Sequence, residues 1–148
     1  MIIQEIPVEI YDFNIIFVYD DNDKTKIPHS ILRKYNINNK RYLRSLYSCL
    51  NKKKGFFTLQ IDSVIFIIIK NEDSVNHLLK CIAHEALHAT IFIMNSVDVS
   101  LNSNSEEAFC YLHDYIVGKI TLCIEDILRL DLQIEKENKE KEVLKSIL

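Results

Sequence analysis

The residues of this chain that could carry out chemistry together are His84, Glu85 and His88, within the segment HEALHA. In a helix, residues four apart lie on the same face, so both imidazole rings could reach a single ion. The glutamate follows the first histidine and could lie beside the metal without binding it, where it would accept a proton from a metal-bound water. This spacing predicts a Zn²⁺ site with His84 and His88 as ligands and Glu85 as the general base.

A catalytic zinc ion needs a third protein ligand, because such ions are held by three side chains and keep one open position. Two candidates, Glu106 and Glu107, open the next predicted helix and could reach back to the histidines if the two helices pack antiparallel. Glu107 shares a helical face with Tyr111 and Asp114, at i, i+4 and i+7, whereas Glu106 could cap the helix or stay in water. Face matching therefore favours Glu107 as the third ligand.

Tyr111 and Asp114 each have both a functional and a structural interpretation. Tyr111 could hydrogen-bond a tetrahedral intermediate, or it could be a core tyrosine with its hydroxyl at the surface. Asp114 could orient a ligating histidine, or it could be a surface aspartate. Cys81 is expected as a buried cysteine rather than a ligand, and His113 as a surface histidine.

The histidine motif lies inside a long helix predicted from about Val75 to Asn95, where apolar residues recur with a period of 3.6. The preceding NEDS segment supplies cap residues, and a polar stretch from Ser96 to Asn104 follows. Ser105 is then a candidate N-cap for a second long helix. The charged tail from about Glu135 onward is predicted as a helical extension or a frayed end.

Three strands are predicted before this helix. Ile10 to Tyr19 form the first, and FFTLQI and VIFIII form a hairpin around Asp62 and Ser63. A helix with a possible break near Asn38 and Asn39 is expected between Pro28 and Leu50. The continuous apolar third strand indicates burial on both faces or a face that receives a ligand. We expect this strand to edge the cleft, where an extended peptide could pair with it by β-augmentation.

The chain is expected to form a single domain over residues 1–148, with the charged extension from about 135. The predicted fold class is α+β. A small, mainly antiparallel sheet would be covered on one side by the helix that carries the histidines and by the second long helix.

Composition excludes some classes of partner. The net charge is −3 and the pI about 5.9, which lacks the basic footprint of nucleic-acid binding. The longest apolar stretch, Val64 to Ile69, falls far short of the roughly 20 residues that cross a bilayer. The acidic N-terminal region does not have the pattern of a signal peptide. We therefore expect a cytoplasmic protein with no membrane partner and with reduced cysteines.

Two stretches, HEALHA and EAFCYL (Glu107–Leu112), resemble the gluzincin metallopeptidases, and more closely the small phage- and prophage-encoded zincin-like proteins. In those proteins a strand hairpin precedes a helix reading HEA-x-HA, and a later helix reads EA-x-x-YL. The resemblance covers roughly Phe56 to Ile120. No downstream histidine or arginine clearly matches the transition-state donor of larger members.

The resemblance implies a zincin-like fold and a zinc-dependent metallopeptidase that acts on a peptide or protein substrate. It assigns Glu107 as the third ligand and Glu85 as the general base, and it places Tyr111 beside the site. The rival interpretation is a catalytically inactive binding or structural protein of a phage particle or of a phage–host interaction. In that case the C-terminal helix could mediate self-association or contact a virion partner. A regulatory protease that cuts a repressor is a third possibility, although no sensor domain is evident.

Overall fold

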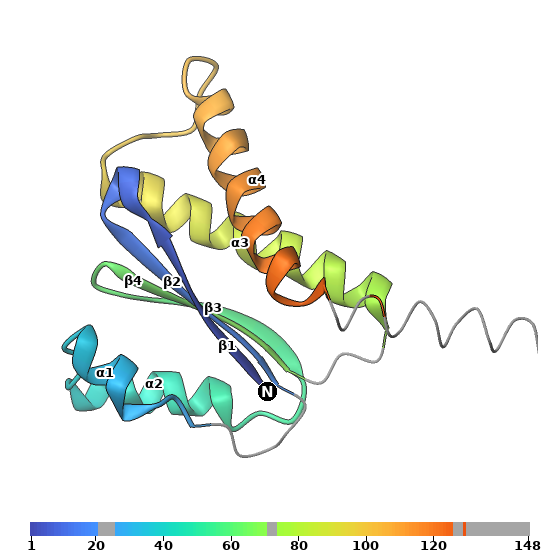
Figure 1. Ribbon diagram of the computed structural model, residues 1–148. Coiled ribbons are helices and arrows are strands. Elements are labelled where there is room, and N and C mark those ends of the chain that lie inside the picture. Colours follow the sequence, from blue (N-terminus) through green and yellow to red (C-terminus); the bar gives the residue numbers. More distant parts are fainter. Residues whose placement is uncertain (21–25, 71–73, 126–128, 130–148) are drawn as a thin grey trace, which may run out of the picture.

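The computed structural model describes residues 1–20, 26–70, 74–125 and 129, which form a sheet with helices on both faces (Figure 1). The charged tail predicted from Glu135 onward lies outside the described residues. The elements in chain order are β1 (Ile2–Val8), the short 3-10 helix η1 (Glu9–Tyr11), β2 (Phe13–Asp20), α1 (His29–Lys34), α2 (Lys40–Leu50), β3 (Gly55–Ile61), β4 (Val64–Lys70), α3 (Val75–Ser96) and α4 (Glu106–Cys123).

The strands form one four-stranded sheet in the order β1-β2-β4-β3. β1 pairs antiparallel with β2, and β3 pairs antiparallel with β4, whereas the two central strands β2 and β4 run parallel. The predicted hairpin around Asp62 and Ser63 is confirmed, and Asp62 occupies the left-handed region with φ 51°. The α+β class, with a mostly antiparallel sheet packed against two long helices, is also confirmed.

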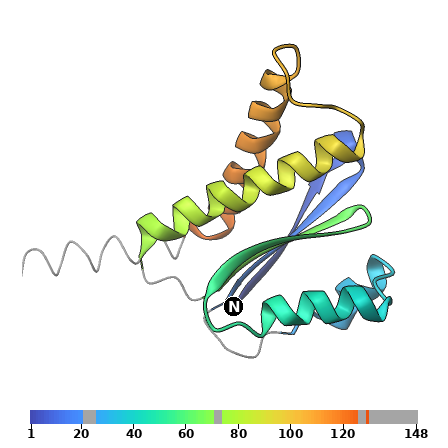
Figure 2. The same ribbon diagram turned by 180° about the vertical axis from the view of Figure 1, so that it is seen from behind.

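Helices cover both faces of this sheet (Figures 1 and 2). α3 and α4 lie on one face, over a hydrophobic cluster built from them and from the sheet. α1 and α2 lie on the other face, over a second cluster. The predicted helix between Pro28 and Leu50 is interrupted, as the asparagines indicated, between α1 and α2. The expected cover of one side by the two long helices is confirmed, and α1 and α2 close the second face.

β4 is buried along its whole length, since all seven residues from Val64 to Lys70 are buried. Burial on both faces explains its continuous apolar run, as predicted. The expectation that this strand edges the cleft is wrong, because β4 lies between β2 and β3. An interior strand has both of its backbone edges paired, so the edge strand on this side of the sheet is β3.

β1 precedes the first strand that the sequence predicts, at Ile10 to Tyr19. The chain leaves β1 through η1 and turns at Asp12, which has φ 54°, before β2 begins. β1 is an edge strand of mixed burial that contains Pro7, and both features weaken its sequence signal. The carbonyl oxygen of Pro7 accepts a hydrogen bond of 2.8 Å from the Tyr115 hydroxyl, which joins β1 to α4.

Glu5 joins β1 to the end of α1 on the other face. Its carboxylate accepts hydrogen bonds from the Lys34 ammonium and from the Tyr35 hydroxyl, the latter at 2.7 Å. These two donors, Lys34 first, hold the pKa of the Glu5 carboxyl below its usual value, because they stabilise its charged form. Polar contacts therefore supplement the backbone pairing of this edge strand.

The two long helices begin where the sequence predicts. The Ser74 hydroxyl accepts the backbone N–H of His77 at 3.2 Å, which caps α3. Ser105 immediately precedes α4, but its hydroxyl donates to the Ser100 carbonyl at 2.6 Å and closes the preceding loop instead of capping the helix. Across the described ranges, no helix has both the length and the apolar character needed to cross a bilayer.

The two parallel strands end in a buried ion pair. Asp20 closes β2 and Lys70 closes β4, and the two residues are partners in the strand register. Lys70 Nζ lies 3.0 Å from Asp20 Oδ2, and both side chains are almost completely buried. Because a buried charge is costly unless it is paired, this contact holds the ends of the central strands together.

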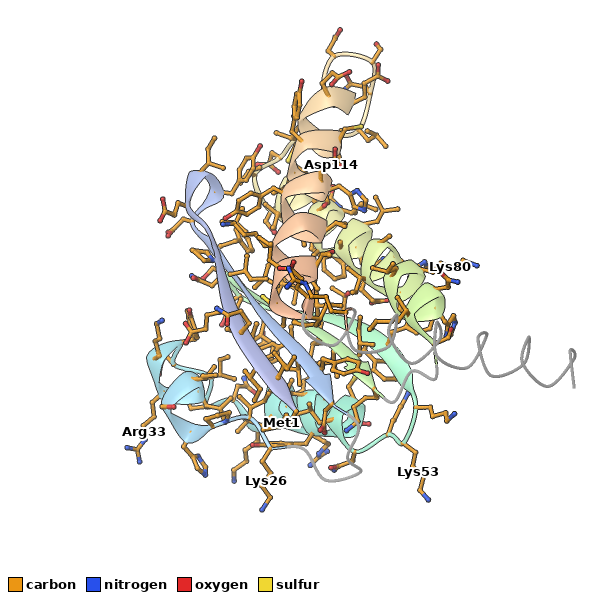
Figure 3. The ribbon with its side chains drawn as sticks, turned by 45° about the vertical axis from the view of Figure 1, so that its right-hand side comes forward. Met1, Lys26, Arg33, Lys53, Lys80 and Asp114 are labelled. Carbon is orange, nitrogen blue, oxygen red and sulfur yellow. The ribbon has the colours of Figure 1, made fainter. Side chains whose placement is uncertain are left out.

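Replacing Lys70 by methionine should lower the free energy of unfolding by about 3–5 kcal/mol, because Asp20 would remain buried without its ammonium partner. The double variant Asp20→Leu/Lys70→Met should recover most of that loss. Lys80→Met, at an exposed position of α3 (Figure 3), is the control and should change stability by less than about 0.5 kcal/mol. Urea denaturation measures all three, and equal stability of Lys70→Met and Lys80→Met would contradict the expectation.

Candidate metal centre

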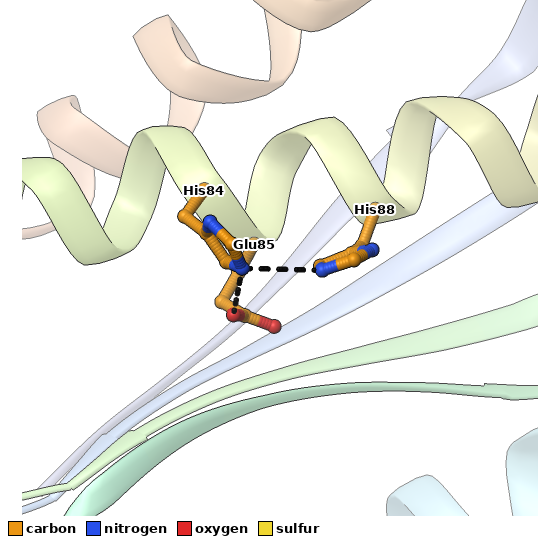
Figure 4. A group of neighbouring side chains, drawn as sticks. All are labelled: His84, Glu85 and His88. Atoms are coloured by element: carbon orange, nitrogen blue, oxygen red, sulfur yellow. Dashed lines mark hydrogen bonds and ion pairs between the residues drawn. The ribbon is translucent and has the colours of Figure 1, made fainter.

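Three side chains of α3 lie close enough together to hold a metal ion (Figure 4). They are His84, Glu85 and His88, and their ligand atoms all lie within 4.8 Å of one another. The two histidines are exposed, whereas Glu85 is buried. The structure thus brings together the three residues of the histidine motif as a possible metal-binding group.

The helical spacing places the two imidazole rings beside each other. Nε2 of His88 lies 3.2 Å from Nε2 of His84, and the ring centroids are 4.9 Å apart. Phe56 of β3 meets the His84 ring edge-on at a centroid distance of 5.7 Å. Phe92, one helical turn after His88, stacks on that ring at 6.5 Å. Each imidazole therefore has one aromatic neighbour, Phe56 for His84 and Phe92 for His88.

The separation of the two nitrogen atoms fits a shared metal ion. Two nitrogen ligands, each about 2.1 Å from a tetrahedral zinc ion, are roughly 3.4 Å apart. The observed separation of 3.2 Å is close to this value, although it also lets one ring donate its N–H to the other. Since imidazole also suits copper, nickel and iron, the geometry indicates a metal-binding group without selecting the metal.

Glu85 is 3% exposed and is held by Thr58 of β3. Thr58 Oγ1 lies 2.6 Å from Glu85 Oε2 and 3.1 Å from the backbone oxygen of Glu85. The hydroxyl has one proton to donate, and the shorter distance lies in the range of hydrogen bonds to a carboxylate. The second carboxylate oxygen, Oε1, is 3.7 Å from His84 Nε2. It therefore faces the histidine pair at more than hydrogen-bond distance.

Thr58 is a residue of this site that we did not identify from the sequence. Alternate side chains of β3 face α3. Phe56 contacts His84, Thr58 contacts Glu85, and Gln60 Nε2 donates to the Ser96 hydroxyl at 3.0 Å. The signal available in the sequence was the alternation itself, which places Phe56, Thr58 and Gln60 on one face of the predicted strand.

Glu107 lies outside the group that the structure brings together. It is in the first turn of α4, and its side chain is exposed. Tyr111, one turn later, is 72% exposed and lines a groove beside β1 and η1. α4 faces α3 instead through His113, whose Nε2 lies 3.0 Å from the carbonyl oxygen of Ala83. Ligation by Glu107 and a catalytic role of Tyr111 therefore stay predictions.

The structure also places the other residues that the sequence left open. His113 lies partly at the surface, with a side chain that is 27% exposed and in contact with α3. Asp114 is exposed on α4, as Figure 3 shows, and its Oδ1 lies 3.7 Å from His113 Nδ1. Cys81 is buried in the core, as predicted.

Comparisons with known proteins add no assignment to this geometry. No family model, curated protein or solved structure matches the chain. The resemblance to zincin-like proteins thus rests on sequence motifs of this chain alone. Of these motifs, the structure supports the histidine motif, as a possible metal-binding group on an α+β fold.

Protein purified without a metal-affinity tag should contain about one metal ion per chain, because the two imidazoles offer a shared site, and the sequence pattern predicts that this ion is zinc. His84→Ala and His88→Ala should each lose this metal. His29→Ala is the matched control, since it removes an exposed histidine from α1 on the other face of the sheet. Elemental analysis measures the content, and a protein that is isolated without metal and rebinds no zinc would contradict the prediction.

Proposed function

We propose that this protein is a zinc-dependent metallopeptidase. The proposal is carried by one arrangement on α3, in which two histidine nitrogen atoms lie 3.2 Å apart and a buried carboxylate oxygen lies 3.7 Å from one of them. This arrangement combines a pair of metal ligands with a proton acceptor beside it. Metal-assisted hydrolysis requires both.

Each residue of the motif has a separate task in this proposal. His84 and His88 would hold Zn²⁺, which would supply Lewis acidity at the substrate carbonyl and lower the pKa of a water molecule. Glu85 would accept a proton from the water that attacks the carbonyl carbon, and it would later deliver that proton to the leaving nitrogen. The C–N bond of the peptide would then break, and the products would be a carboxylic acid and an amine. Burial of Glu85 limits the directions in which its carboxylate can point.

The edge strand beside the metal group supports an extended peptide as the substrate. β3 packs against α3, and within the described ranges its outer backbone edge has no strand partner. A peptide could add to this edge by β-augmentation. The sequence pattern favours the VIFIII segment for this role, but that segment forms the interior strand β4. The opposite edge is less suitable, because Pro7 of β1 has no N–H and its carbonyl already accepts the Tyr115 hydroxyl.

Two carboxylates compete for the position of the third ligand. We retain Glu107 as the proposed ligand and Tyr111 as the proposed donor to the tetrahedral intermediate, on the pattern EAFCYL. Because Glu107 is exposed in the first turn of α4, ligation requires that turn to approach the histidines. Glu85 is the carboxylate already beside them, and it becomes the alternative third ligand if Glu107 stays away.

A metal-binding protein without catalysis is the second candidate. One observation favours it: within the described residues, the metal-binding group of His84, Glu85 and His88 contains a single carboxylate. One carboxylate cannot serve as metal ligand and general base together. In that case the metal would stabilise a binding or structural module. Bound zinc without cleavage of any member of a diverse peptide library would favour this candidate.

Glu85→Gln separates the two roles of the motif. The amide keeps the shape of the side chain but cannot accept the proton, so zinc should stay bound while peptide hydrolysis falls by about 10²-fold or more. His88→Ala should lose the metal itself, and with it the stabilisation that metal binding gives to the folded state. Zinc content and turnover are measured on both variants. Release of zinc from Glu85→Gln as readily as from His88→Ala would show that Glu85 is a ligand.

Glu107→Ala tests the proposed third ligand. If Glu107 binds the ion, zinc affinity should fall by about tenfold or more, since losing a ligand should exceed the effect of losing a hydrogen-bond partner of a ligand. Glu106→Ala is the matched control in the same helical turn. It should cost at most a few tenths of a kcal/mol, through a weaker helix N-terminus. Zinc affinity is measured by titration against a competing chelator. An unchanged zinc affinity in Glu107→Ala would contradict ligation by Glu107 and would favour Glu85 as the third ligand.

A further inference from the structure

We propose that Thr58 is a positioning residue that keeps Glu85 available as a base and prevents it from binding the metal. This inference rests on the proposed function and deepens it, because it gives the edge strand β3 a part in the chemistry. It starts from a single hydroxyl group that contacts the same glutamate twice.

Thr58 holds the carboxylate of Glu85 from the neighbouring strand. The hydroxyl oxygen lies 2.6 Å from Oε2 and 3.1 Å from the backbone oxygen of Glu85. Because the hydroxyl has one proton, it donates to the closer atom, Oε2, and so attaches the carboxylate of Glu85 to the neighbouring strand. Since Glu85 is 3% exposed, few water molecules can replace this hydrogen bond.

Holding Oε2 determines where the other oxygen can go. Oε1 faces the histidine pair at 3.7 Å from His84 Nε2. Oxygen and nitrogen ligands of one tetrahedral zinc ion would be about 3.3 Å apart, so a shift of roughly half an ångström would bring Oε1 to ligand distance. A base needs the opposite arrangement, with its free oxygen near the attacking water and not on the ion. Release of Oε2 would therefore favour ligation over catalysis.

The side chain of Thr58 can be changed without disturbing the packing of the strand. Valine has nearly the same shape but lacks the hydroxyl, whereas serine keeps the hydroxyl and loses a methyl group. The neighbouring contact between β3 and α3 supplies a matched control. Gln60 donates to Ser96 on the same pair of elements but does not contact Glu85, so Gln60→Met tests the loss of a strand-to-helix hydrogen bond alone.

The test uses the full chain with Co²⁺ in place of zinc, because the visible absorption of cobalt reports the number and type of ligands. Thr58→Val should change this spectrum and bind cobalt about tenfold more tightly, as Glu85 joins the ligands. Thr58→Ser and Gln60→Met should keep the parent spectrum. The double variant Thr58→Val/Glu85→Gln should match Glu85→Gln alone. In peptide hydrolysis by the zinc form, Thr58→Val should lower kcat by about 10- to 100-fold with little change in KM, and Thr58→Ser should retain most activity.

The outcomes separate this inference from the proposed function. If the parent binds cobalt but hydrolyses no peptide, the peptidase proposal fails while the spectra still decide the role of Thr58. An unchanged spectrum in Thr58→Val, or a Thr58→Ser variant that behaves like Thr58→Val, overturns the positioning role. Thr58→Ala provides the same comparison if Thr58→Val does not fold. A parent protein that binds no cobalt overturns both proposals.

Discussion

The parallel pairing of β2 with β4 is the constraint on which the rest of this fold depends. Antiparallel neighbours can be joined by a tight turn, but parallel neighbours need a crossover connection. Here the crossover carries α1, α2 and β3, so that two helices cover one face and β3 pairs with the outer side of β4. α3 must then return over the remaining face. Its place above β3 and β4 brings the histidines to the edge of the sheet.

The metal-binding group has a local part and a part that depends on the fold. The distance between His84 and His88 follows from helical spacing, and any stable helix would provide it. The environment of the group comes from β3, which supplies Phe56 against one imidazole and Thr58 against the buried carboxylate. Displacement of α3 relative to β3 would leave the histidine pair intact but would release Glu85. The two parts can therefore be perturbed separately.

The local features of the fold and of the site were accessible from the sequence. The histidine motif, the Ser74 cap and the hairpin at Asp62 each depend on a few consecutive residues, and the structure contains all three. Features that depend on pairing between distant segments were not accessible. The role of Thr58 requires β3 to lie beside α3. The position of β4 inside the sheet requires β1 and β2 to lie beyond it.

The orientation of α4 shows a different limit. This helix carries apolar or aromatic residues on several sides, so helical spacing does not decide which side meets α3. In the structure His113 faces α3, whereas Tyr111 lines the groove beside β1 and η1. The shared face of Glu107 and Tyr111 follows from spacing, but the direction of that face is a property of the packed protein. The third ligand is thus the feature of the site that sequence spacing constrains least.

The interruption of the β1 edge at Pro7 has a consequence for assembly. A sheet with two open edges can grow without limit, because each added chain presents a new edge to the next one. In this protein Pro7 and the Tyr115 hydroxyl interrupt one edge, and β3 forms the other. Two copies that met through β3 would leave only interrupted edges facing outward. Pairing of this kind would therefore stop at two copies, because each outward edge would be a β1 strand interrupted at Pro7.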